Sequence, residues 1–312
     1  MCYSAMVWAS YSRFVSAFRA DISIHDFVRI YLQRDAGKPV AIPRAMDDAF
    51  ARPRTPEDFE ILRCINRHRA RQAEKFEAER TAQRARLDKA RASLQAKPTK
   101  KAENDARIAA SKLSKAEHDL ADLQRTTPLP RDQRIFPKTY APVMIAVDGR
   151  RTVVPMRYLI RPAGFPPSFD TTHHGAYNAR RDNLQKFWRH QFTHTHGVVV
   201  LQTFYEWVER TRDDGTTVKQ ELEFDPQGMD DMVAACIWSR WTGSDGEILD
   251  SFALITDDPP PEVAAAGHDR CIIPLRAQHI DAWLNPTPGD YGAMQAILED
   301  RERPYYEHRV AA

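Results

Sequence analysis

Residues 57 to about 125 constrain the fold of this chain most, because they carry one helical pattern bounded on both sides by prolines. Positions of a partly polar seam, most of them apolar or small, recur there in alternating steps of three and four, with one interruption at Lys97-Pro98-Thr99-Lys100. This spacing predicts two helices that pack as an antiparallel coiled-coil hairpin. The expected seam consists of Phe59, Leu62, Asn66, Arg69, Ala73, Phe76, Arg80, Gln83, Leu87, Ala90 and Leu94, then Ala106, Ala109, Leu113, Ala116, Leu120 and Leu123.

The boundaries of this segment indicate an insertion within another domain. Prolines stand at positions 53 and 56 on one side and at 128 and 130 on the other, and proline ends or prevents a helix. We therefore expect one domain in two parts, residues 1–50 and 128–312, with the helical hairpin inserted at residues 51–127.

Charge is distributed unevenly along the chain. The formal net charge is +2, yet residues 61–130 hold 17 Lys and Arg against 9 Asp and Glu. A basic surface fits a polyanionic partner, and a solvated helix face is the commoner explanation. Residues 57–125 are therefore a candidate to extend a DNA contact or to bind a protein partner, with a purely structural arm as the alternative.

The flanking parts predict a mixed α and β domain. Asp-Gly pairs at positions 148, 214 and 245 separate strand-like runs and favour antiparallel hairpins. The expected strands span residues 143–147, 152–160, 197–208, 216–224, 232–241 and 248–256. Helices are expected at about residues 10–34, 182–190, 259–266 and 276–284.

Composition limits the compartment. The sequence contains no run of about 18 apolar residues, and its first residues lack the pattern of a secretory signal. The four cysteines, Cys2, Cys64, Cys236 and Cys271, are widely spaced without a CxxC pair, which argues against a disulfide framework or a zinc ribbon. We expect a cytoplasmic protein without membrane contact, associated with the nucleoid if the source is bacterial.

Cys2 is the residue with the most distinctive chemistry if the initiator methionine is removed. Its α-amine and thiol would then sit on adjacent carbons, with reference pKa values of about 7.7–8.0 and 8.5. Such a 1,2-aminothiol condenses with an aldehyde to form a five-membered thiazolidine ring. An internal cysteine lacks the amine and cannot do this.

Four separated motifs resemble those of the SRAP family (SOS response-associated peptidase). They are Met1-Cys2, the segment Tyr177-Asn178-Ala179-Arg180-Arg181-Asp182, the segment Thr203-Phe204-Tyr205-Glu206-Trp207, and Ile255-Thr256 followed by Gly267-His268-Asp269-Arg270. The resemblance covers about residues 1–50 and 128–312. It implies an α+β fold with an antiparallel, partly barrel-like sheet, and a protein that senses abasic sites in single-stranded DNA and cross-links to them through Cys2.

The resemblance also implies roles for individual residues. Cys2 would be the nucleophile, Asn178 would orient its amine, and Glu206 and His268 would move protons. A carboxylate among aromatic residues has its charged form disfavoured, which suits a proton shuttle, whereas strand alternation alone would allow Glu206 to be an exposed residue. Asn178 also reads as an N-cap or turn residue, and His268 as part of an ordinary turn.

Contacts to DNA are implied for Arg180, Arg270, Thr256 and Phe165. Guanidinium groups suit phosphates because they present forked donors and keep their charge. Phe165 and Phe169 would offer an apolar surface to bases, with packing in the core as the alternative. The chain departs from the family pattern after Cys2, where Tyr3-Ser4 replaces Gly-Arg, and after Asn-Ala-Arg. We interpret it as a divergent member.

Other chemistries have weaker support in the sequence. His194-x-His196, with His173, His174 and His190 nearby, lacks the further ligands of a recognisable zinc site, and no glycine-rich phosphate loop is present. We therefore expect no metal and no cofactor. Two alternatives remain: an N-terminal-nucleophile thiol peptidase that uses Cys2 with His268 as base, and a non-catalytic scaffold that binds nucleic acid or protein through the hairpin.

Overall fold

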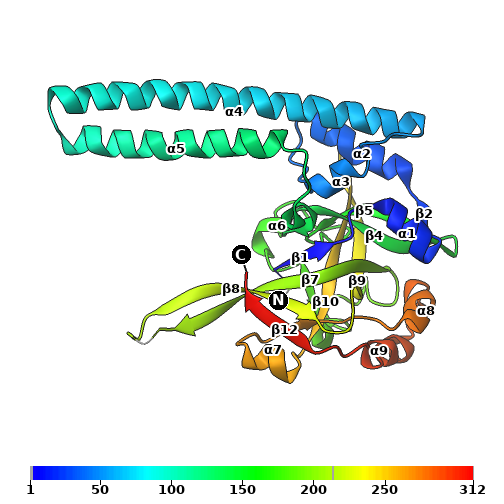
Figure 1. The fold of residues 1–312 in the computed structure, drawn as a ribbon. Coiled ribbons are helices and arrows are strands. Elements are labelled where there is room, and N and C mark those ends of the chain that lie inside the picture. The colour runs from blue at the N-terminus through cyan, green and yellow to red at the C-terminus, as the bar shows by residue number, and fades with distance from the viewer. Residues whose placement is uncertain (1–2, 213, 312) are drawn as a thin grey trace.

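The computed structural model describes residues 3–212 and 214–311, which form a mixed α and β body with a long helical arm (Figure 1). Within these residues the strands belong to one 12-stranded sheet. The helices are α1 (Tyr11–Phe18), α2 (Ile24–Asp35), α3 (Arg44–Asp48), α4 (Pro56–Ala96), α5 (Lys100–Gln124), α6 (Phe169–Thr172), α7 (Pro261–Ala265), α8 (Ile280–Leu284) and α9 (Tyr291–Glu299), with short 3₁₀ turns at Pro130–Gln133, Arg181–Asn183 and Ala277–His279. The strands are β1 (Ser4–Val7), β2 (Asp21–Ile22), β3 (Arg134–Ile135), β4 (Tyr140–Val147), β5 (Arg150–Tyr158), β6 (Asn178–Arg180), β7 (His196–Thr211), β8 (Thr217–Pro226), β9 (Met232–Thr242), β10 (Ile248–Asp257), β11 (Cys271–Ile272) and β12 (Tyr306–Val310).

Five of the strands close a ring of hydrogen-bonded pairs. β4 pairs with β5 and β7, β7 with β9, β9 with β10, and β10 in parallel with β5. The central strands are buried along most of their length, as in β10, because both of their faces are covered. The expected α+β class is therefore confirmed, as are the three hairpins at the Asp-Gly turns.

The N-terminal strand β1 lies between β3 and β7. In its antiparallel register with β7, Ser4 faces Tyr205 and Ala5 faces Phe204. All four residues of β1 are buried. The described chain therefore begins beside the Phe-Tyr-Glu-Trp motif.

The predicted helical hairpin is confirmed as α4 and α5, which pack against each other and extend away from the body (Figure 1). Thr55 starts α4 with a capping box, since its side chain accepts from the backbone N–H of Asp58 and the Asp58 carboxylate accepts from the backbone N–H of Thr55. Thr99 caps α5 in the same position through the backbone N–H of Ala102. Proline at position 98 separates the helices.

The predicted seam is right in the outer part of the arm and wrong at its base. Leu87 and Ala90 of α4 are buried, as are Ala109, Ala116 and Leu120 of α5. Phe59, by contrast, is 55% exposed. At the base, α4 buries Ile61, Cys64 and Ile65 instead, because there it packs against α2. The heptad pattern of α4 alone could not predict the contact with α2.

Two helix predictions are also wrong. The segment 10–34 is interrupted, because Arg19 adopts a left-handed conformation (φ 52°) and Asp21–Ile22 pair with β5. The segment 182–190 forms a 3₁₀ turn and further turns rather than a helix, with the carbonyl of Asn183 accepting from the backbone N–H groups of Lys186 and Trp188. Helix α9 and strand β12 were not expected. None of the helices in the described ranges combines the length and apolarity needed to cross a bilayer.

Candidate active site at the end of strand β1

Glu206 lies in the middle of β7 on the buried face of the strand. Phe204, Glu206 and Val208 alternate on that face and are each no more than 3% exposed, whereas Trp207 on the other face is 48% exposed. The interpretation of Glu206 as a solvent-exposed strand residue is therefore wrong. Burial raises the pKa of the Glu206 carboxyl, and the hydrogen bond with His268 opposes that rise.

His268 is brought to Glu206 by the turn that follows α7. Gly267 occupies a left-handed conformation there (φ 93°), which glycine adopts readily. His268 Nε2 lies 3.2 Å from Glu206 Oε2, and both side chains are more than nine-tenths buried. The turn that the sequence indicated is present, and it places the histidine against the carboxylate.

The contacts of the other ring nitrogen, Nδ1, decide which nitrogen of His268 carries the hydrogen. His268 Nδ1 lies 2.9 Å from the carbonyl oxygen of Arg270 and 3.3 Å from the backbone nitrogen of Arg270. We assign the hydrogen to Nδ1, because the closer oxygen is only an acceptor. Nε2 and Oε2 then need one further proton between them, so the pair exists as a neutral acid and imidazole or as an ion pair.

Asn178 lies in the short strand β6, which runs parallel to β10 with Asn178 opposite Leu254. It is 7% exposed and lines the same cavity as Glu206 and His268. The residue that caps the following 3₁₀ turn is Arg180, so the interpretation of Asn178 as an N-cap is wrong.

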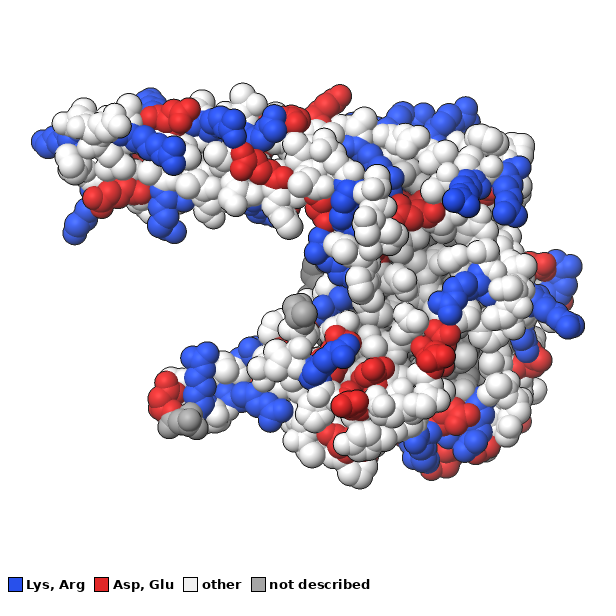
Figure 2. Space-filling model, in the orientation of Figure 1, with Lys and Arg blue, Asp and Glu red and all other residues white. Residues whose placement is uncertain are grey.

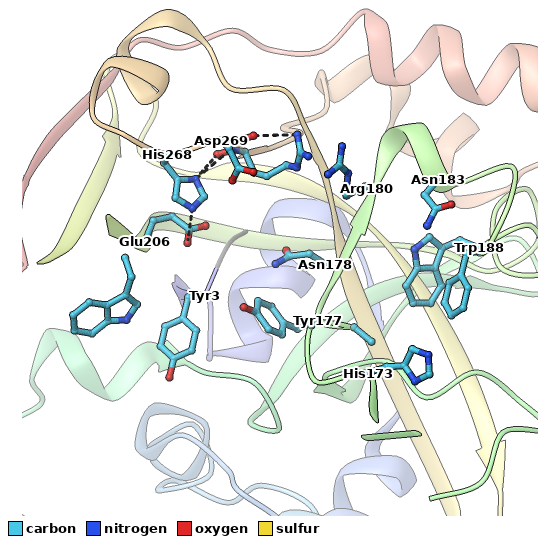
Figure 3. A pocket seen from close by; sticks show the side chains of 15 residues that line it. Tyr3, His173, Tyr177, Asn178, Arg180, Asn183, Trp188, Glu206, His268 and Asp269 are labelled. Atoms are coloured by element: carbon cyan, nitrogen blue, oxygen red, sulfur yellow. Dashed lines mark hydrogen bonds and ion pairs between the residues drawn. The ribbon is translucent and has the colours of Figure 1, made fainter. Parts of the chain in front are cut away.

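The cavity has a volume of about 560 Å³ and is open on one side. Figure 3 shows Glu206 and His268 pointing toward each other at its wall, with Tyr3, Tyr177 and Asn178 nearby. The lining residues are Tyr3, His173, Gly175, Ala176, Tyr177, Asn178, Arg180, Asn183, Phe187, Trp188, Glu206, Trp207, His268, Asp269 and Arg270. The wall therefore combines aromatic side chains with the polar side chains of Glu206, His268 and Asn178.

Arg134 fixes the strand that leads to the cavity. Its guanidinium donates to Ser4 Oγ (3.0 and 2.8 Å), pairs with Glu221 and stacks 3.7 Å from the ring centre of Tyr205. Ser4 is fully buried. The predicted nucleophile, Cys2, lies outside the described residues, and Tyr3 is the described residue that precedes Ser4 in the cavity wall.

The two predicted phosphate-binding arginines both line the cavity, and each has a carboxylate partner. Arg180 pairs with Asp182 at 2.8 Å and keeps half of its side chain exposed, while Arg270 pairs with Asp258 at 3.0 Å with only 10% exposed. The hydrogen bond with Asp182 raises the pKa of Arg180 above its ordinary value. Arg180 is therefore accessible beside the cavity and Arg270 is mostly buried, and each charge is balanced by a carboxylate.

The other two predicted DNA contacts lie elsewhere. Thr256 of β10 is 1% exposed and is not among the residues that line the cavity. Phe165 is 43% exposed but lines a neighbouring cavity of about 510 Å³, against Phe169, whose ring centre is 5.0 Å away. Phe187 lines both cavities.

Sequence reasoning missed several residues of the site. Trp207 was identifiable, because it alternates with Glu206 and must face outward. Arg134, Trp188 and His173 carry no local signal, since only the folding of distant segments brings them to the cavity. Tyr3 was noted as a departure from a motif rather than as part of the wall.

The described cysteines are poor nucleophiles. Cys64, Cys236 and Cys271 are free thiols that are 1%, 0% and 6% exposed. Burial raises the pKa of Cys64 and of Cys236, and it raises the pKa of Cys271 to about 12. A thiolate is the reactive form, so none of the three competes with an N-terminal cysteine.

His196 has a structural role. Its Nε2 accepts from the backbone N–H of Thr193 at 3.0 Å, its Nδ1 lies 2.9 Å from the Trp283 carbonyl, and its ring stacks on Trp283. Burial lowers the pKa of His196 to about 3. Over the part of the chain that the structure describes, no three His, Cys, Asp or Glu side chains are grouped to hold a metal ion.

The fold and site define a mixed α and β protein with a buried Glu–His pair in an aromatic cavity at its N-terminal strand. The model of the family described as SOS response associated peptidase (SRAP) matches residues 81–311. The chain therefore belongs to the SRAP family. The matched region contains Asn178, Glu206 and His268 but not Cys2, and it starts inside α4. Membership suggests a function in the response to DNA damage, with DNA as partner.

Solved structures with some similarity include a protein from Bacteroides thetaiotaomicron, with 18% identity, a TM-score of 0.48, and coverage of 57% of this chain and 77% of that chain. A Bordetella bronchiseptica protein has 17% identity, a TM-score of 0.46, and coverage of 58% and 87%. A phage-related protein of the same species has 18% identity, a TM-score of 0.43, and coverage of 57% and 80%. No curated protein matches the chain.

Proposed function

We propose that this protein senses abasic sites in single-stranded DNA and captures their aldehyde through the α-amine and thiol of Cys2. The observation that carries the proposal is the buried contact of His268 with Glu206 in a cavity whose wall includes Tyr3. Cys2 directly precedes Tyr3 in the sequence. The proposal requires removal of Met1.

The chemistry needs no cofactor. The α-amine adds to the aldehyde carbon, water leaves to give a Schiff base, and the thiol adds to the same carbon. Two bonds to carbon form, the carbon–oxygen double bond breaks, and one water is released. Nothing is oxidised or reduced, so the site has only to move protons and hold the reactants together.

Glu206 and His268 supply the proton transfers in this proposal. The acid protonates the hydroxyl that leaves as water, and the resulting base receives the proton released as the thiol adds. A raised pKa suits Glu206 for both steps, because the carboxyl then exchanges a proton nearer to neutral pH. His268 shares the proton through its 3.2 Å contact.

The remaining predicted residues position the reactants. Asn178 holds the amine, Arg180 and Arg270 hold phosphates beside the lesion, and Trp207 stacks on a neighbouring base. Phe165 and Thr256 stay predictions of DNA contact, and Thr256 would act from beneath the surface. The setting we propose is the cytoplasm, or the nucleoid if the source is bacterial.

An adduct assay tests the proposal. The protein is incubated with a single-stranded oligonucleotide that contains one abasic site, and the products are separated under heat and SDS. We expect an adduct with the parent protein, none with Cys2→Ala, and adduct formation unchanged in Cys236→Ala. An equal yield from Cys2→Ala would exclude Cys2 as the nucleophile.

A thiol peptidase is the second candidate, favoured by the description of the family as a peptidase. Cys2 would then attack a peptide carbonyl with His268 as base. Peptide turnover that is lost in Cys2→Ala, without reaction toward abasic DNA, would support it. The same protein preparations therefore separate the two candidates.

A further inference from the structure

The outer part of the helical arm is strongly basic, and we define this arm tip as residues 86–112. It contains eight Lys and Arg against three Asp and Glu. Of these eight, only Arg86 forms an ion pair within the described residues. The other seven basic side chains, all exposed, are Lys89, Arg91, Lys97, Lys100, Lys101, Arg107 and Lys112. Figure 2 shows blue side chains along this arm with red ones between them, and an open concave space between the arm and the body.

The arm carries these charges on a rigid support. Arg84 pairs with Glu117 at 2.7 Å and Arg86 pairs with Asp105 at 2.6 Å, which ties α4 to α5. At the base, Arg67 and Arg71 both pair with Asp35 of α2. From Arg71 to Ala96 a helix rises about 38 Å at 1.5 Å per residue, so the tip stands well away from the body.

The surface of the arm does not suit a protein partner that docks through apolar contacts. Its seam is filled by its own two helices, with Leu87 and Leu120 buried. Every large apolar side chain described between positions 60 and 124 is at least partly buried. Stable protein interfaces have an apolar centre, whereas a polyanion needs only accessible positive charge.

We propose that the arm tip binds the phosphate backbone of double-stranded DNA that flanks the single-stranded lesion. This inference rests on the proposed function for its choice of DNA. A reach of about 38 Å corresponds to about 11 base pairs at 3.4 Å per pair along one strand. Duplex DNA is rigid over that length because its persistence length is about 150 base pairs, so one duplex can contact both the body and the tip.

The β7–β8 hairpin supports the same geometry. It extends to the same side as the arm in Figure 1 and lies on the other side of the open space in Figure 2. Its outer part carries the exposed side chains Arg210, Arg212 and Lys219. The exposed acidic side chains Glu209 and Asp214 stand among them, so this border carries both signs of charge and the basic surface belongs to the arm tip. β1 lies between the two borders in Figure 1.

The test compares two DNA probes and two sets of variants in the full chain. One probe is an eight-nucleotide single strand with an abasic site, and the other carries the same strand as the overhang of a 20-base-pair duplex. In the reversal variant Lys89, Arg91, Lys100 and Lys101 are all changed to Glu. In the matched control the same positions are Lys89→Arg, Arg91→Lys, Lys100→Arg and Lys101→Arg.

We expect the reversal variant to bind the tailed duplex at least about tenfold more weakly, with a plot of log K against log salt less steep by about 3. The control should keep the affinity of the parent. Adduct formation with the short probe should be unchanged in every variant. A smaller variant, Lys100→Glu with Lys101→Glu, places acidic residues at the start of α5, where they favour the helix, and should show about half of the change in slope.

Equal affinity and equal salt dependence of parent and reversal variant would overturn the inference and leave a protein partner as the use of residues 57–125. Failure of the proposed function looks different. In that case the short probe gives no Cys2 adduct, while the tailed duplex without an abasic site still reports on the arm tip.

Discussion

His268 Nε2 lies 3.2 Å from Glu206 Oε2, and this contact joins the turn after α7 to the middle of β7. Both side chains are more than nine-tenths buried, and together they line the cavity. The wall that contains them also contains Tyr3. The proposed chemistry at the N-terminus depends on this arrangement.

Glu206→Gln should slow adduct formation by a factor of about 10² to 10⁴, the usual contribution of a general acid or base. Protonation of the Cys2 α-amine lowers the rate of parent and variant alike below about pH 7.7. Only the parent should show a further loss as Glu206 takes up its proton, at a pH above the ordinary value of 4.5, because burial raises the pKa of Glu206. Rates measured from pH 4 to pH 8 check both expectations. A full rate in the Gln variant would show that the carboxyl is not needed.

The same substitution should stabilise the folded protein at neutral pH. A carboxyl with a raised folded-state pKa favours the native state when protonated, and that contribution is lost as pH rises through the folded pKa. Gln carries no charge, so the substitution removes the destabilisation that the buried carboxylate causes at neutral pH. Thermal unfolding at pH 4 and pH 7.5 should show Glu206→Gln more stable than the parent only at the higher pH. A lower melting temperature at pH 7.5 would contradict this account of the carboxyl.

Arg134→Ala should weaken both the fold and the reaction, because Arg134 contacts Ser4, Tyr205 and Glu221 at once. We expect a loss of about 1–3 kcal/mol in the free energy of unfolding, the usual cost of leaving a hydrogen-bonded partner unsatisfied. Arg134→Lys keeps the charge but loses the fork and the stacking. Urea unfolding and adduct rates check this prediction, and parent-like rates in both variants would mean that β1 needs no such support.

His196 should make the protein sensitive to acid. Burial lowers its folded-state pKa to about 3, so the stability it contributes is present above the unfolded pKa near 6.5 and is lost as pH falls toward 3. The expected slope is about 1.4 kcal/mol per pH unit for one proton. Urea unfolding between pH 4 and pH 6 should give a shallower pH dependence for His196→Gln. The same slope in parent and variant would assign the acid sensitivity to other groups.

Leu87→Ala should destabilise the arm by about 2–3 kcal/mol, as large-to-small changes do at buried positions. Leu94→Ala is a matched control, because Leu94 occupies the next heptad but is only partly buried. Hydrogen exchange of α4 and α5 should speed up in the first variant and change little in the second. Equal effects would mean that the seam extends evenly to the end of the arm.

The sequence predicted the parts of the structure that depend on local pattern. The two arm helices, the antiparallel hairpins and the turn at Gly267 follow from prolines, alternation and glycine, and these features act within a few residues. The motifs also placed Asn178, Glu206 and His268 in one cavity. That success came from the family resemblance, because no spacing along the chain brings residues 206 and 268 together.

Long-range packing explains what the sequence missed. Phe59 occupies a heptad position, yet α2 packs on a different face of α4, so Ile61 and Ile65 are buried instead. The interruption at Asp21–Ile22 arises because these residues pair with β5, more than a hundred positions later. Arg134 was not singled out for the same reason, since its value depends on β1, β7 and β8 meeting around it.

The measurement that tests the central claim most directly is mass spectrometry of the protein after reaction with an abasic oligonucleotide. We predict a product whose mass equals the chain without Met1 plus the oligonucleotide minus one water, with the modification located at Cys2 after digestion. An adduct located at a lysine or at another cysteine, or an adduct on a chain that keeps Met1, would contradict the account.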